Sequence, residues 1–281
     1  MRPIHRPERR PDRRAARQRV SRAGGFTLIE AIVTMTVLAI VGGMIAVFLR
    51  TPIDAYTDTA RRADLTDTAD TALRRFDREI RTALPNSIRS AASGGVLYLE
   101  FLQTTGAGRY RIAATSPGVG NPLDFTAADT SFDILGSIPS VPGGAFLVVM
   151  NLGAGSGADA YAGDNRSTIA SLSGSTLSFA SFLFPFDSPA HRFFVVDTPV
   201  TYACNPAAGT LTRISGYTIA ASQPTPPASG TVTLVADKVS ACNFTYDAIA
   251  SRTGMVSASL TLTSGGESVR LFRQVAVSNA P

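Results

Sequence analysis

The sequence contains no tryptophan, two histidines, two cysteines and one lysine, Lys238. Histidine and cysteine are the usual zinc ligands and histidine is the usual general base, so this scarcity argues against a metal centre or a catalytic triad. There is also no Gly-x-Ser-x-Gly nucleophile elbow and no phosphate-binding loop ending in Gly-Lys-Ser/Thr. The sequence therefore predicts no catalytic residue, no metal and no cofactor.

The excess of positive charge is confined to the first 25 residues, although the whole chain has a net charge of +5. Residues 1–25 hold nine arginines and two acidic residues, whereas the remainder holds 17 basic and 19 acidic residues. A nucleic-acid-binding domain needs a basic surface that tracks the phosphates. Because no such surface is predicted after residue 25, no nucleic-acid partner is expected.

One long apolar segment follows the basic region. Residues 26–49 carry a single charge, Glu30, and are long enough to span a hydrocarbon core of about 30 Å as a helix. A secretory signal peptide has a shorter apolar region. Because the preceding arginines favour the cytoplasmic side, we expect 1–25 to be a cytoplasmic leader and 85–281 to be exported from the inner membrane.

The junction between the leader and the apolar segment carries a short motif. Gly24-Gly25 is followed by Phe26-Thr-Leu-Ile-Glu30. This order resembles the prepilin signature of type IV pilins and type II secretion pseudopilins. The resemblance implies that a prepilin peptidase cleaves after Gly25 and methylates the new amine of Phe26. It also implies that Glu30 pairs with the terminal amine of a neighbouring subunit; the alternative is a glutamate that reaches interfacial water.

The helix is predicted to continue to Leu84 and to end before Pro85. Residues 50–84 form its amphipathic half, because Leu65, Ala69, Leu73, Phe76, Ile80 and Leu84 recur at spacings of three and four. The charged residues between them predict a solvated face with local ion pairs. Gly42, Gly43 and Pro52 predict local flexibility, or alternatively a tolerated glycine pair and an interfacial proline.

The remainder, 85–281, is rich in glycine, serine, threonine and β-branched residues. Apolar runs predict these strands: 96–102, 145–150, 177–184, 192–196, 211–217, 231–239, 243–247, 256–262 and 269–277. Gly106–Gly120, Gly153–Arg166 and Ser222–Gly230 are predicted loops. The fold class is therefore α+β, with a type IV pilin-like helix, membrane anchor plus amphipathic half, packed on an antiparallel β-rich domain.

A few residues in the exported domain are candidates for other chemistry. Cys204 and Cys242 predict a disulfide in an oxidising compartment, with two buried thiols as the alternative. His191 is interpreted as structural or as the exposed start of a strand. Asp159, Asp164 and Asn165 lie in a glycine-rich loop, for which calcium binding is an alternative to a solvated loop.

Several longer segments resemble the O-type minor pilins of the mannose-sensitive haemagglutinin (MSHA) pilus. They are Ala60–Arg89, Val200–Cys204, Leu211–Tyr217, Val239–Tyr246 and Val277–Pro281. The family's cysteine pairing carries onto Cys204 and Cys242, whereas the long, arginine-rich leader departs from the family. The resemblance implies a minor pilin that primes or caps a filament. Its partners would be a prepilin peptidase, an inner-membrane assembly platform and other pilins and minor pilins.

Two other functions remain open at this point. One is a pseudopilin of a type II secretion system, which belongs to the same class of filament. The other is a membrane-tethered binding protein or enzyme whose anchor only resembles a prepilin signal.

Overall fold

The structure is a computed structural model that describes residues 25–250 and 253–281. The predicted leader therefore lies outside the described residues, apart from Gly25. The chain divides into two compact units, Met1–Ala55 and Tyr56–Pro281. The long helix α1 (Leu28–Ile80) begins in the first unit and contributes its last turns to the second.

The helix ends four residues earlier than the sequence predicts. After Ile80 the backbone hydrogen bonds span three residues instead of the four of an α-helix. The N–H of Thr82 donates to the carbonyl of Glu79 (3.0 Å), and the N–H of Ala83 donates to the carbonyl of Ile80 (3.1 Å). The N–H of Leu84 then donates to the carbonyl of Leu102 (2.8 Å). The chain thus leaves the helix before Pro85, because pairing with a strand replaces the helical hydrogen bonds.

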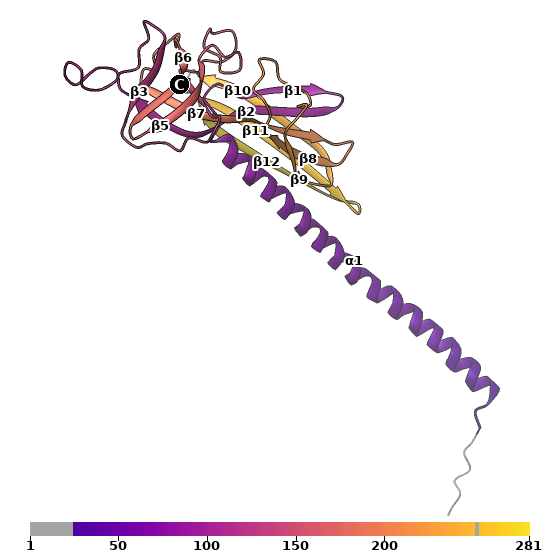
Figure 1. Cartoon of the computed structure of the whole chain (residues 1–281). Coiled ribbons are helices and arrows are strands. Elements are labelled where there is room, and N and C mark those ends of the chain that lie inside the picture. The colour runs from indigo at the N-terminus through magenta and orange to yellow at the C-terminus, as the bar shows by residue number, and fades with distance from the viewer. Residues whose placement is uncertain (1–24, 251–252) are drawn as a thin grey trace, which may run out of the picture. The chain divides into compact units, whose positions relative to one another are not determined.

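The described residues of the second unit form twelve strands, most of which are labelled in Figure 1. In chain order they are β1 (Arg89–Ser93), β2 (Val96–Tyr110), β3 (Asp129–Leu135), β4 (Phe146–Val149), β5 (Arg166–Ser173), β6 (Thr176–Phe182), β7 (Arg192–Asn205), β8 (Thr210–Ser215), β9 (Thr231–Ala236), β10 (Val239–Ala250), β11 (Thr253–Ser264) and β12 (Glu267–Ser278). They form a nine-stranded sheet, ordered β1-β2-β3-β6-β5-β4-β7-β8-β9, and a three-stranded sheet, ordered β10-β11-β12. All their pairings are antiparallel, so the class α+β is confirmed.

The last turns of α1 and both sheets share one hydrophobic core. The predicted apolar stripe of the helix is buried, together with Ala72. The ring of Phe76 lies between Tyr202 on β7 (5.1 Å between centroids) and Phe244 on β10 (5.6 Å). The amphipathic helix therefore holds the two sheets together through its apolar face.

A second core belongs to a closed ring of strands. Because β2 also pairs with β7, the strands β2, β3, β6, β5, β4 and β7 close on themselves. Buried aromatic and aliphatic side chains, including Tyr110, Phe132 and Phe193, fill the ring. In Figure 1, β3, β5 and β6 accordingly group apart from β8, β9 and β12. A six-stranded ring filled by side chains forms a packed lobe.

Three strands, β1, β3 and β5, are missing from the sequence-based prediction, and β7 is longer than predicted. β7 continues through Pro199, which pairs with Leu102 beside a register shift in β2. A proline lacks the N–H that a regular ladder uses, so it is tolerated at such an irregularity. β3 and β5 are short and rich in polar residues, and neighbouring strands on both sides stabilise them.

The prediction that Gly106–Gly120 is a loop is wrong for its first five residues. Gly106 and Gly108 lie within β2, where another part of the chain approaches closely. A Cβ on Gly106 would lie 2.7 Å from the Cβ of Pro139, and one on Gly108 would lie 2.7 Å from the ring of Phe193. These glycines therefore permit close packing inside a strand rather than a turn.

Replacing Gly108 with alanine should destabilise the protein by about 1–3 kcal/mol, because the added methyl group overpacks a filled ring. Gly143→Ala is the matched control, since its Cβ would meet no atom within 4 Å. Chemical denaturation of both variants measures the difference. Equal midpoints and slopes for the two variants would show that the close approach to Phe193 is not maintained.

Candidate functional site

The N-terminus of α1 is capped by Thr27. Its Oγ1 accepts a hydrogen bond from the N–H of Glu30 (3.3 Å), and its carbonyl accepts one from Ala31 (3.1 Å). Thr27 and Glu30 thus have the Ser/Thr-x-x-Glu spacing of a capping box, a local signal that the sequence analysis missed. Gly25 and Phe26 precede this cap in non-helical backbone.

Glu30 lies on the exposed surface of the first helical turn. The hydroxyl of Thr34 on the following turn donates to helix carbonyls, at 2.8 Å to Glu30 and 3.0 Å to Ala31. Thr34 is therefore satisfied within its own helix. The carboxylate of Glu30 has no side-chain partner among residues 25–250 and 253–281, so an external partner would be needed in an apolar environment.

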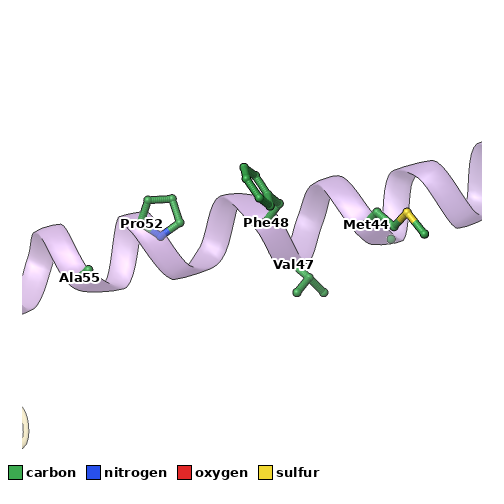
Figure 2. Close-up of a pocket in the computed structure, with 6 residues that line it drawn as sticks. Met44, Val47, Phe48, Pro52 and Ala55 are labelled. Atoms are coloured by element: carbon green, nitrogen blue, oxygen red, sulfur yellow. The ribbon is translucent and has the colours of Figure 1, made fainter.

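The N-terminal part of α1 exposes almost all of its apolar side chains. Met44, Val47 and Phe48 project outward from the helix, and the Phe48 side chain is 83% exposed (Figure 2). Within the described residues, α1 is the one helix long and apolar enough to cross a membrane. Such a surface is stable only when lipid or other helices cover it.

The helix remains continuous at the three positions predicted to be flexible. Gly42, Gly43 and Pro52 all lie within α1. A Cβ added to either glycine would meet no atom within 4 Å, so no contact within the chain requires glycine there. Local flexibility at these residues stays a prediction.

The charged residues of the packed part of α1 make both local and long-range ion pairs. Local pairs such as Arg74 with Asp70 agree with the prediction of a solvated face. Glu79, however, also binds Arg213 of β8 (2.7 Å), and Asp70 binds Arg273 of β12 (3.2 Å). Burial alone would raise the pKa of Glu79, but hydrogen bonds from Arg213 and Arg75 lower it. The charged face therefore also ties the helix to the sheets.

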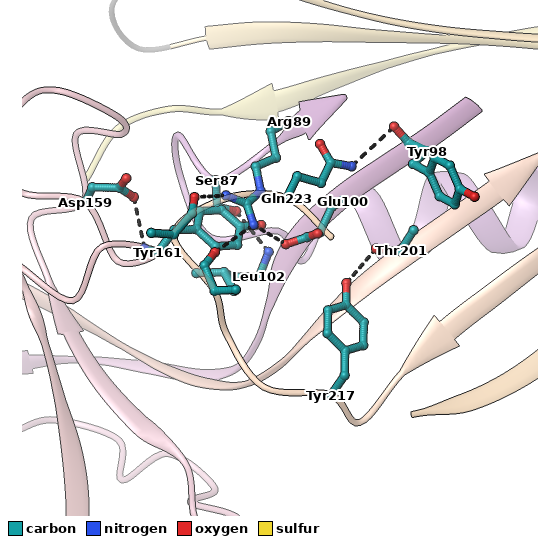
Figure 3. Close-up of polar contacts among 12 residues, drawn as sticks. Ser87, Arg89, Tyr98, Glu100, Leu102, Asp159, Tyr161, Thr201, Tyr217 and Gln223 are labelled. Atoms are coloured by element: carbon teal, nitrogen blue, oxygen red, sulfur yellow. Dashed lines mark hydrogen bonds and ion pairs between the residues drawn. The ribbon is translucent and has the colours of Figure 1, made fainter. Parts of the chain in front are cut away.

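A buried polar cluster joins β1 and β2 to the loop that follows β8 (Figure 3). The guanidinium of Arg89 lies 3.5 Å from the ring centroid of Tyr161 and donates to Glu100 Oε1 at 2.8 Å. It also donates to the carbonyls of Ala220 (2.8 Å) and Ala221 (2.6 Å). Arg89 thus fixes the loop to the sheet by charge-assisted hydrogen bonds.

Glu100 is the acidic member of this cluster and is completely buried. Burial raises its pKa, and the pairing with Arg89 offsets this only in part. The hydroxyl groups of Tyr217 and Thr201, beside Glu100, share a hydrogen bond of 2.5 Å. The cluster therefore has a structural role: Arg89, paired with Glu100, clamps the loop after β8 to the sheet.

The other residues that the sequence offered as candidates for chemistry make packing contacts and hydrogen bonds within the β-rich domain. His191 immediately precedes β7, and its ring packs edge-on to Tyr110. Asp159 accepts from the N–H of Tyr161 (2.9 Å), while Asn165 is buried and donates to the carbonyl of Met150 (3.2 Å). No group of three or more metal-ligating side chains occurs within 25–250 and 253–281.

A disulfide joins Cys204 on β7 to Cys242 on β10, with the two Cα atoms 6.6 Å apart. The alternative of two free thiols is therefore wrong. Because β7 and β10 belong to different sheets, the bond links the nine-stranded and three-stranded sheets covalently. Cys204 is buried in the core that also contains Phe76.

Comparison with known proteins identifies the N-terminal segment. Residues 20–46 match the model of the prokaryotic N-terminal methylation motif. This motif supports a type IV prepilin-like protein, of the pilin or pseudopilin kind, and the described residues also contain one candidate membrane helix and a disulfide. This motif implies processing by prepilin peptidase and assembly with other pilins, and it suggests a structural subunit rather than an enzyme. No curated protein and no solved structure matches the chain.

Proposed function

We propose that this protein is a minor pilin of an MSHA-type type IV pilus. The precursor would be held in the inner membrane by residues 26–49, with the β-rich domain in the periplasm, and would then enter the filament. The observation that carries the proposal is the methylation motif, which includes the start of a helix with exposed apolar side chains. The segments that resemble the MSHA minor pilins support an MSHA-type minor pilin over other pilins and pseudopilins.

The local geometry of the N-terminus supports processing after Gly25. The Gly25–Phe26 bond precedes the helical cap, so a peptidase can reach backbone that is not hydrogen-bonded in a helix. Cleavage there would leave Phe26 as the new N-terminus and keep Thr27 as the cap. The type IV pilin fold, with residues 26–84 as its helical spine, is part of this proposal.

The exposed carboxylate of Glu30 supports a role in assembly. A carboxylate in a membrane helix is disfavoured on insertion scales by up to about 2.5–3.5 kcal/mol, the value at the helix centre. The terminal amine of a neighbouring subunit would offset this by forming an ion pair, and would thereby set the register between helices.

The size of the exported domain supports a position at the end of the filament. In a helical shaft each domain must fit between neighbours above and below it. The closed ring of six strands adds a lobe with its own core to the sheet that packs on the helix. A subunit that primes or caps the filament has fewer neighbours to accommodate such a lobe.

Replacing Glu30 with alanine should lower the amount of this protein in sheared pili by at least about tenfold, because one ion pair in a membrane-like environment is lost. Thr34→Ala is the matched control, since the Thr34 hydroxyl is satisfied within its own helix. Immunoblots of pilus and membrane fractions measure the distribution, and mass spectrometry identifies the N-terminus.

Both variants should remain in the membrane with a methylated Phe26 as their first residue. An unprocessed N-terminus in the wild-type protein would contradict the proposed precursor. Equal recovery of the Glu30 and Thr34 variants in pili would contradict the assembly role of Glu30.

A further inference from the structure

A pocket with a volume of about 330 Å³ lies on the exported domain, between the closed ring of strands and the loop after β8. Phe146 of β4, Arg166 of β5 and Asp197 of β7 line one side. Tyr217 and Ser229, which lie near the two ends of the loop, line the other. The pocket therefore combines one cation, one anion, hydroxyl groups and an apolar wall.

Arg166 is unusual among the half-buried arginines of the described residues. The others each pair with a carboxylate: Arg75, Arg89, Arg111, Arg213 and Arg273. Arg166 forms no ion pair with any described residue, and its Nη1 is buried without a hydrogen-bond partner. Burial lowers the pKa of Arg166, and the more distant charge of Asp159 compensates in part. A half-buried guanidinium without an anion is an incomplete arrangement.

The surroundings of Arg166 fix its position. The guanidinium carbon lies 4.9 Å from the ring centroid of Phe146, within the range of a cation–π contact. The loop that forms the opposite wall is held by Arg89, which donates hydrogen bonds to the carbonyls of Ala220 and Ala221. The pocket is therefore formed before any ligand arrives, which lowers the entropic cost of binding.

We propose that this pocket is a binding site for a carboxylate, which pairs with Arg166. A planar guanidinium binds a carboxylate through two parallel hydrogen bonds. Because Asp197 lines the same pocket, the ligand must also place a hydrogen-bond donor beside its carboxylate. Two kinds of ligand carry both groups. In a small hydroxylated acid the donor is a hydroxyl group, and in an acidic residue of a partner protein the donor is the backbone N–H.

Titration of the full-length protein in detergent micelles tests the proposal with four probes. Glucuronate is compared with glucose, and N-acetyl-glutamate amide is compared with N-acetyl-glutamine amide. In each pair only one compound carries a carboxylate. We expect at least one carboxylate to bind about tenfold or more tightly than its neutral counterpart, since hydrogen bonds to charged groups are among the strongest.

The two pairs distinguish the source of the carboxylate. Preference for glucuronate indicates a small hydroxylated acid, and preference for the glutamate amide indicates an acidic side chain of a partner. Either result, or both, supports the carboxylate site. If neither carboxylate binds better than its neutral counterpart, the proposal is wrong.

Arg166→Gln should weaken carboxylate binding by about tenfold. Arg192→Gln, which removes the same charge from an exposed position at the start of β7, should leave it unchanged. Equal affinities of these two variants would refute the role of Arg166.

Asp197→Asn provides a test that does not depend on the folding of the Arg166 variant. It keeps a hydrogen-bond acceptor and removes a negative charge, so carboxylate affinity should rise severalfold while binding of the neutral probes stays the same. An unchanged or lower carboxylate affinity would count against a carboxylate in this pocket.

Discussion

Replacing Phe76 with alanine should lower the free energy of unfolding by about 3–5 kcal/mol. The Phe76 ring is 1% exposed and contacts Tyr202 on the nine-stranded sheet and Phe244 on the three-stranded sheet. Its removal leaves a cavity where the helix and both sheets meet. Because whole domains are stable by only about 5–15 kcal/mol, this one change should remove a large part of the total.

Phe272→Ala is the matched control for this measurement. Phe272 lies on β12 and is 61% exposed, so its truncation should change the stability by less than about 0.5 kcal/mol. Chemical denaturation followed by near-ultraviolet circular dichroism reports tertiary packing in a protein without tryptophan. A loss below about 1 kcal/mol for Phe76→Ala would mean that the helix does not join the two sheets as described.

The helix was predictable from the sequence because its signals are local. Apolar residues at spacings of three and four predicted the buried stripe that includes Leu65 and Phe76. The end of the helix was not predictable from Pro85 alone. It depends on the hydrogen bond between Leu84, in the segment after the helix, and Leu102 on β2.

The β-rich domain was predictable only where strands are apolar. β3 and β5 carry few apolar residues, and their pairing partners determine that they are strands. Gly106 and Gly108 suggested a loop, although they are needed for close packing within β2. The closed ring depends on the pairing of β2 with β7, about 90 residues later, which no local pattern encodes.

The candidate sites divide in the same way. The methylation motif around Gly25 and Glu30 is contiguous, so the sequence reveals it. The clamp of Arg89 and Glu100 joins the loop near residue 220, and the pocket at Arg166 joins four separate segments. Charge pairing across such distances leaves no periodic signal, and these groups become recognisable only when the fold brings them together.

Replacing Cys204 and Cys242 together with alanine should lower the free energy of unfolding by up to about 4 kcal/mol. The disulfide closes a loop with a sequence separation of 38, and it restricts the unfolded chain accordingly. Thermal and chemical denaturation under oxidising conditions measure the loss. A reducing agent should lower the free energy of unfolding of the wild-type protein to that of the double variant, and it should leave the value for the variant unchanged.

The position of the disulfide also predicts where the destabilised protein opens. The three-stranded sheet β10-β11-β12 is joined to the rest by the core around Phe76 and by the bond from Cys242. The closed ring of six strands has a separate core. Hydrogen exchange should therefore accelerate first in β10, β11 and β12 of the double variant, whereas amides in β3, β5 and β6 should keep their protection. Uniform acceleration across both groups would show that the disulfide stabilises the domain as a whole rather than the junction between its sheets.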